Sequence, residues 1–83
     1  MKATVLVRPK EGILDPQGEA VRGGLDHLGF PVREARVGRV IDLDVEAATA
    51  DDARAAVEQM CQSLLANPLI ESYEIEIDDP EAP

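Results

Sequence analysis

Residues 32–46 read VREARVGRVIDLDVE, and this stretch decides how the chain folds. Most of its apolar side chains share one parity and most of its charged side chains share the other, which is typical of a β-strand with one buried and one exposed face. Fifteen residues at ~3.3 Å each span about 50 Å, whereas a globule of this chain length has a diameter on the order of 30 Å. We therefore expect the strand either to bend near Gly38 or to project and pair with another chain.

Patterns on both sides of this stretch predict four further elements. A strand over residues 2–8 ends at Pro9, and a helix over 15–29 begins at Asp15. A second helix covers residues 49–67, and a last strand covers 70–78. The order β-α-β-α-β predicts an α+β fold, namely a two-layer sandwich with a long bent middle strand and helices on one face of a mostly antiparallel sheet.

The length of the chain limits how it is stabilised. At 83 residues we expect a single domain over residues 1–79 with a frayed C-terminal tail at 80–83. Cys61 is the only cysteine and His27 the only histidine, so no internal disulfide and no Cys/His metal cluster can help. Association with other chains is therefore the favoured source of extra stability.

Charge and hydropathy exclude several classes of partner. The net charge is −9, and residues 40–83 hold twelve acids against one arginine, whereas residues 1–39 hold seven Lys/Arg against five acids. An acidic chain repels a phosphate backbone, so we expect no nucleic acid. No apolar run is long enough for a signal peptide or a membrane span, and with one thiol this predicts a cytoplasmic protein without a membrane partner. The asymmetric charge suits contacts between copies or with a basic partner, or else it only keeps the domain in solution.

Groups that could carry catalysis do not gather in the sequence. His27 falls off the main apolar stripe of its helix, and Cys61 falls on the stripe of the second helix, where a thiol acts as a small hydrophobe. Asp42, Asp44 and Glu46 share one strand face and could form a cation site, although carboxylates in a row on a wet face usually serve solvation. We therefore expect no catalytic, cofactor-binding or metal-binding residue on this chain.

The first helix begins firmly and is then weakened by glycine. Asp15 and Pro16 suit its N-cap and first position, yet Gly18, Gly23 and Gly24 follow inside it. Each interior glycine costs about 0.5–1 kcal/mol relative to alanine. Gly18 leaves the first turn without side-chain cover, which predicts close approach by another protein or by an anionic group. The alternative is that the glycines are tolerated on a face exposed to solvent.

Four segments together resemble the PurS family, the small subunit of phosphoribosylformylglycinamidine synthase. They are KEGILDPQGEAV at 10–21, LGF at 28–30, REARVGRVIDLDV at 33–45 and VEQMCQSLLANPLIESYEIEI at 57–77. The resemblance spans residues 2–77 in the same order and at the same spacing.

The resemblance implies a non-catalytic subunit of an ATP-dependent C–N ligase complex in purine biosynthesis. Such a complex amidates formylglycinamide ribonucleotide with ammonia from glutamine. PurS dimers sit between a glutaminase and a synthetase subunit, supporting ammonia transfer, and ATP and magnesium bind to the synthetase. We therefore expect a homodimer or larger homo-oligomer with both subunits as partners. The candidate contact residues are Gly12, Leu14, Asp15, Pro16, Gln17, Gly18, Arg36, Gly38 and Arg39.

Two alternatives to this function remain at the level of sequence. The first is a stand-alone small-molecule regulatory domain of ferredoxin-like topology, and the second is a cation-binding module at the three carboxylates. For the arginines at 36 and 39, the alternative to a partner contact is an ordinary solvated strand position.

Overall fold

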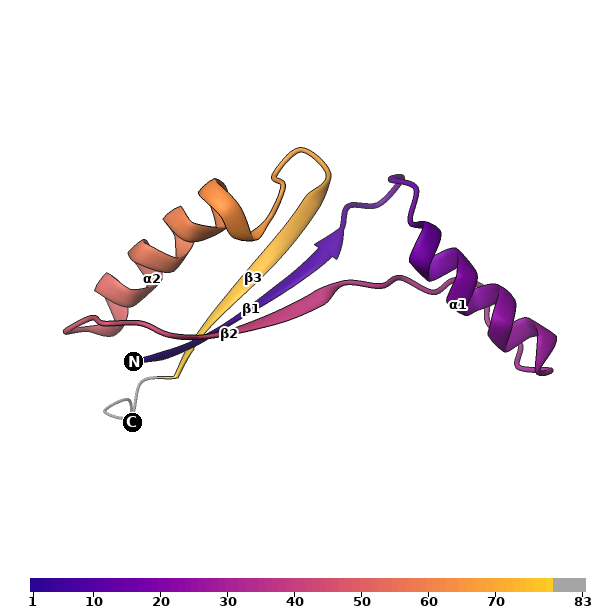
Figure 1. Ribbon diagram of the computed structural model, residues 1–83, viewed down its shortest axis with the longest axis horizontal. Helices are drawn as coiled ribbons and strands as arrows, with labels where there is room; N and C mark the ends of the chain where they lie inside the picture. The colour runs from indigo at the N-terminus through magenta and orange to yellow at the C-terminus, as the bar shows by residue number, and fades with distance from the viewer. Residues whose placement is uncertain (79–83) are drawn as a thin grey trace.

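A computed structural model describes residues 1–78 as a three-stranded antiparallel sheet with two helices (Figure 1). The strands are β1 (Lys2–Pro9), β2 (Arg39–Asp44) and β3 (Glu71–Asp78), in the order β2-β1-β3. The helices are α1 (Pro16–His27) and α2 (Ala50–Met60), and α2 continues into a π-helical turn, η1 (Cys61–Leu65). The predicted α+β class, the element order and the antiparallel sheet are confirmed.

The core lies between the sheet and α2. Central strand β1 is antiparallel to both neighbours, with Val5 opposite Ile41 of β2 and Ile75 of β3. Its residues Ala3, Val5 and Val7 face α2 and are buried, as are Val57 of that helix and Cys61 of η1. The alternation of apolar and polar residues therefore selects the buried face. We call the sheet with α2 and η1 the head, which comprises residues 1–9 and 39–78.

Helix α1 lies beyond the end of the sheet, which differs from the expected arrangement. Only α2 packs on a sheet face, whereas α1 stands away from the head at the far end of the molecule (Figure 1). The connections on both sides of α1 run outward from the ends of β1 and β2 and carry the helix with them. The chain is therefore long and narrow, with extents of 50 × 28 × 17 Å.

The middle strand is shorter than predicted. Its pairing with β1 starts at Arg39, opposite Val7. Because β1 ends two residues beyond Val7, at Pro9, residues 32–36 continue outward with no strand to pair with. Of the two outcomes expected for this stretch, projection beyond the domain is the one observed.

Both helix starts and the end of α1 agree with the sequence signals, whereas the second helical segment ends at Leu65, before the predicted end at residue 67. The Asp15 side chain caps α1 with Pro16 in its first turn, and Gly29 follows the helix with φ at 94°. The Thr49 side chain caps α2 by accepting from the Asp52 amide. No helix within residues 1–78 combines the length and apolar character needed to cross a membrane. The tail predicted at 80–83 lies outside the described residues.

Val57→Ala tests the position of the core. The Val57 side chain is fully buried, so we expect its truncation to lower the free energy of unfolding by about 2–3 kcal/mol. Urea unfolding followed by far-UV circular dichroism measures this loss. Val40→Ala is the matched control, because Val40 is exposed, and it should cost under about 0.5 kcal/mol. Equal losses for the two variants would contradict the placement of α2 over the sheet.

Candidate functional site

The nine predicted contact residues gather in one region, between the head and α1. We call this region the neck and define it as residues 10–18 and 35–39. Gly12, Leu14, Asp15 and Arg36 help line one hollow of about 410 Å³. Arg36, Gly38 and Arg39 help line a second hollow of about 500 Å³. Pro16, Gln17 and Gly18 form the adjoining first turn of α1.

The Asp15 carboxylate fastens α1 to the extended segment. Its Oδ1 accepts a hydrogen bond from the Gly18 amide at 3.0 Å, and its Oδ2 accepts one from the Val37 amide at 2.9 Å. These bonds, with that from Val37 the strongest influence, lower the pKa of Asp15 below its ordinary value. One ionised side chain therefore caps the helix and fixes its direction relative to residues 35–37.

Gly18 is covered by its own chain, which corrects the prediction of a bare helix start. Within α1 it is the one buried residue. A Cβ at this position would collide with the backbone carbonyl oxygen of Ala35 and with the Asp15 carboxylate. Glycine is therefore needed so that the first turn can approach the extended segment, and partner contact does not account for it.

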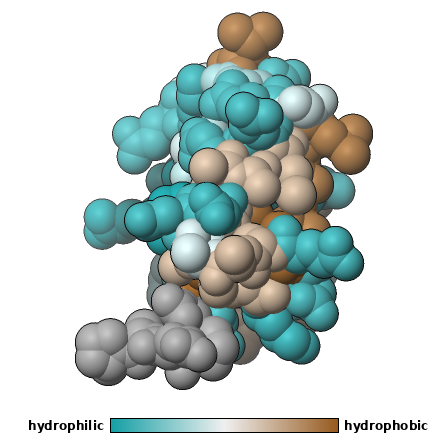
Figure 2. Space-filling view, turned by 90° about the vertical axis from the view of Figure 1, so that its left-hand side faces the viewer, coloured by the Kyte–Doolittle hydropathy of each residue, from teal (hydrophilic) through white to brown (hydrophobic). Residues whose placement is uncertain are grey.

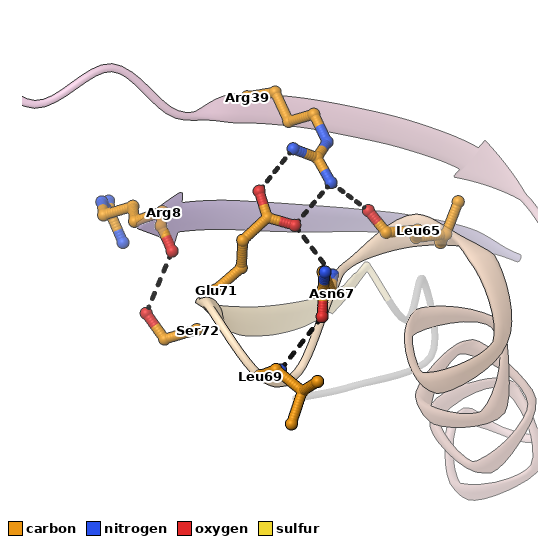
Figure 3. Close-up of polar contacts among 7 residues, drawn as sticks. All are labelled: Arg8, Arg39, Leu65, Asn67, Leu69, Glu71 and Ser72. Atoms are coloured by element: carbon orange, nitrogen blue, oxygen red, sulfur yellow. Dashed lines mark hydrogen bonds and ion pairs between the residues drawn. The ribbon is translucent and has the colours of Figure 1, made fainter. Parts of the chain in front are cut away.

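Arg39 is engaged within the chain (Figure 3). Its Nη1 and Nη2 donate to Oε2 and Oε1 of Glu71 at 2.7 and 3.0 Å, and Nη2 also donates to the Leu65 carbonyl at 2.5 Å. The Asn67 amide donates to the same carboxylate at 2.8 Å. The Arg39 guanidinium, followed by the Asn67 amide, holds the pKa of Glu71 below its usual range.

This ion pair joins three separate parts of the head. Arg39 starts β2, Glu71 starts β3, and Leu65 ends the π-helical turn. Arg39 is about half exposed to solvent, and its guanidinium is already engaged by Glu71 and the Leu65 carbonyl within its own chain.

Glu71 was missed from the sequence, although a signal existed. Arg39 has the parity of Ile41, and Glu71 has the parity of Tyr73, so both charges fall on the strand face that packs against α2. Opposite charges at the inward positions of two strands predict an ion pair, because an unpaired charge there would be costly.

Gly38 is also explained within the chain. A Cβ there would collide with the Val7 carbonyl oxygen, so glycine lets the chain run close to β1 where pairing begins. Among the nine candidates, Leu14 is 81% exposed and the Arg36 side chain lies at the surface between the two hollows. These two residues are best placed to meet another protein.

Reactive groups elsewhere are dispersed. Burial, and then the charge of Glu58, raise the pKa of the Cys61 thiol, so it stays protonated at neutral pH. His27 is exposed at the last position of α1. Within residues 1–78 no three His, Cys, Asp or Glu side chains converge as metal ligands, and Asp42 instead accepts a hydrogen bond from the Thr4 hydroxyl at 3.1 Å.

Comparison with known proteins gives a consistent result. The family model described as PurS, phosphoribosylformylglycinamidine (FGAM) synthase, matches residues 2–79. The FGAM synthase subunit PurS of Methanocaldococcus jannaschii is 40% identical over 78 residues, which are 93% of this chain and 94% of the relative. The crystal structure of M. jannaschii PurS superposes with a TM-score of 0.84 over 96% of this chain and 98% of that one. A chain of the PurLQS structure from Thermotoga maritima is 36% identical, with a TM-score of 0.82 over 90% and 93% of the two chains.

Asp15→Ala tests the contact between α1 and the extended segment. We expect amide hydrogen exchange at Gly18 and Val37 to accelerate on the order of tenfold, because both amides lose their acceptor. Hydrogen exchange followed by NMR measures both amides. Asp26→Ala, an exposed carboxylate on the same helix, is the control and should leave them unchanged. Unchanged protection of the Gly18 and Val37 amides in Asp15→Ala would contradict their hydrogen bonds to the Asp15 carboxylate.

Glu71→Gln tests the ion pair through its pH dependence. Because Arg39 is about half exposed, we expect a loss of only about 1 kcal/mol at pH 7. The folded-state pKa of Glu71 is lowered, so its stabilisation is complete above the ordinary glutamate pKa of about 4.3 and is lost as pH falls through the lowered value. Urea titrations of both proteins should therefore converge in acid. Glu74→Gln, at 3.8 Å from Arg8 in an exposed pair, is the control and should have little effect at any pH.

Proposed function

This chain belongs to the PurS family, the subunits of phosphoribosylformylglycinamidine synthase in purine biosynthesis, and from this premise we propose that it is an assembly subunit. In this proposal it bridges a glutaminase subunit and a synthetase subunit and supports the transfer of ammonia between them. The synthetase subunit binds ATP and magnesium, while this chain binds no cofactor and supplies no catalytic residue. The complex works in the cytoplasm, and copies of this chain associate as a homodimer or larger oligomer.

The observation that carries the proposal is an uncovered arm, which we define as residues 10–38 and which comprises α1 and its two connections. Leu14, Leu28 and Phe30, which flank α1 in the sequence, are 81%, 71% and 55% exposed, and α1 itself lies away from the head (Figure 1). Large apolar side chains that are exposed to water on a small chain are typical of a subunit whose surface is covered by other chains in a complex. The dispersed reactive groups described above are also consistent with a role in assembly.

The competing function, a stand-alone small-molecule regulatory domain, is not favoured. The family match runs from residue 2 to residue 79, and the relatives are matched over nearly their whole length. A match of that extent leaves no separate region of the chain to carry a different function.

Reconstitution with purified glutaminase and synthetase subunits tests the bridging role. Formation of formylglycinamidine ribonucleotide is measured with glutamine or with ammonium chloride as the nitrogen source, each with and without this chain. We expect the glutamine-dependent rate to require this chain, because ammonia must pass between two subunits, and the rate with ammonium chloride to depend on it much less. An equal glutamine-dependent rate in its absence would overturn the proposal.

Leu14→Asp tests whether a partner subunit contacts the neck. We expect it to reduce the glutamine-dependent rate at least about tenfold, because a charge would enter an apolar contact. The ammonium chloride rate should change little. Leu69→Asp is a matched control, since Leu69 is 83% exposed but lies outside the neck. Equal losses in the two variants would show that Leu14 has no particular role.

A further inference from the structure

One face of the sheet is left without a helix on it within residues 1–78. Helix α2 packs on the face that holds Val5 and Val7, and α1 stands away beyond the end of the strands (Figure 1). We call the opposite face, which presents the even-numbered residues of β1, β2 and β3, the outer face. Its residues are charged or polar except for Leu6 and Val40, which lie opposite each other in neighbouring strands. These two apolar side chains interrupt a hydrophilic surface at one place.

The hollow of about 500 Å³ beside the neck lies at this place. Leu6 and Val40 line it together with Arg8 and Arg36, and Gly38 contributes no side chain that could fill it. Val40 is 62% exposed, so the described part of the chain leaves this apolar pair largely open to water. Apolar side chains beside arginine are typical of a surface that contacts another molecule, because interfaces are enriched in arginine.

The two arginines of this hollow have few partners among residues 1–78. Arg8 lies 3.8 Å from the Glu74 carboxylate, which is beyond hydrogen-bond distance, and these side chains are 52% and 67% exposed. Figure 3 shows the Arg8 side chain directed away from the Arg39–Glu71 ion pair. Arg36 takes part in none of the ion pairs within residues 1–78. Because a guanidinium group has five N–H donors, both arginines can hold an incoming anion.

The far end of the outer face differs in charge but is also concave. Lys2, Asp42, Asp44 and Asp78 help line a hollow of about 420 Å³ there, and this end of the head shows mainly hydrophilic side chains (Figure 2). Two copies placed face to face could bring the acidic end of one to the arginines of the other. That arrangement would set one hollow against another and fill neither. The hollow with the arginines therefore fits a protruding group of a different protein better than it fits a second copy.

A protein also fits the hollow better than a free anion does. Arg8 and Arg36 are exposed, and an ion held only by exposed guanidinium groups is screened by water and salt. A protein that lies on the outer face covers Leu6 and Val40 and excludes water from the hollow. Excluding water strengthens each contact between a guanidinium group and a carboxylate.

We propose that the hollow between Arg8 and Arg36 receives a protruding acidic side chain of a partner subunit, and that an apolar neighbour of that side chain packs on Leu6 and Val40. This inference rests on the assembly role proposed above and specifies one surface for it. Arg8 belongs to the head and Arg36 to the neck. One docked carboxylate therefore joins both regions of this chain to the partner.

Charge reversal tests this contact. We expect Arg8→Glu and Arg36→Glu each to weaken binding to one and the same partner subunit at least about tenfold, because each sets a carboxylate against the incoming carboxylate. Val40→Ser should weaken the same binding at least about threefold, because the apolar contact is lost. Isothermal titration calorimetry measures binding to the purified glutaminase and synthetase subunits in turn, with glutamine and ATP present.

Arg33→Glu is the matched control, since Arg33 is an exposed arginine three residues before Arg36 and does not line the hollow. It should leave both affinities within about twofold, and far-UV circular dichroism verifies that every variant is folded. Equal losses in Arg33→Glu and Arg36→Glu overturn the inference. Unchanged binding of Arg8→Glu and Arg36→Glu also overturns it, while the proposed function stands if the glutamine-dependent rate still requires this chain. A wild-type chain that binds neither subunit overturns both.

Two measurements on the isolated chain test for other occupants of the hollow. Calorimetric titration with sodium phosphate and with ATP should show no binding that Arg8→Glu removes. Sedimentation equilibrium should give the same oligomeric state for the wild-type protein and for Arg36→Glu. Binding of phosphate or ATP that depends on Arg8 assigns the hollow to a free anion, and dissociation of copies in Arg36→Glu assigns it to a second copy. Either result overturns the inference.

Discussion

The Asp15 carboxylate connects two segments whose relative position sets the outline of the whole chain. Its two oxygens accept hydrogen bonds from the start of α1 and from residue 37 of the extended segment. Because both bonds come from backbone amides, the helix axis is fixed relative to the path of the chain. The close approach at Gly18 strengthens this restraint by leaving no room for a side chain between the two segments. Helix α1 and the extended segment at residues 35–37 are therefore held together as one unit.

On the head side of the neck, the Arg39–Glu71 ion pair holds the two outer strands together at one end of the sheet. It links the first residues of the two outer strands, and through Leu65 it also holds the end of the α2–η1 unit. The chain therefore enters the sheet at Arg39, a residue that is bonded to both β3 and η1. A helix attached in this way presents its apolar side in a defined direction, and a surface of defined direction is what specific assembly requires.

Local signals in the sequence were sufficient to predict the strands and helices, but they did not predict where α1 lies relative to the sheet. Alternation predicted the strands, and caps at Asp15 and Thr49 predicted both helix starts. The predicted packing of α1 on the sheet was wrong because an amphipathic pattern indicates that a helix has an apolar side, without indicating which surface that side meets. The nine candidate residues lie in one region of the structure, yet Gly18, Gly38 and Arg39 are explained by contacts within the chain. The partner of Arg39 was missed because strand parity places both charges on the inward face, but parity alone does not indicate which residue 32 positions away is the partner.

The strand order β2-β1-β3 leaves the sheet with two open edges, and their composition has a consequence for how large an assembly can become. Asp42 and Asp44 lie on one edge strand, and Glu74, Glu76 and Asp78 lie on the other, with no lysine on either. Strands that pair edge to edge approach to about 4.8 Å, well inside the screening length of about 8 Å at physiological salt. Repulsion between like edges therefore opposes fibril growth by this route. The negative charge on both edge strands therefore disfavours polymerisation through the edges of the sheet.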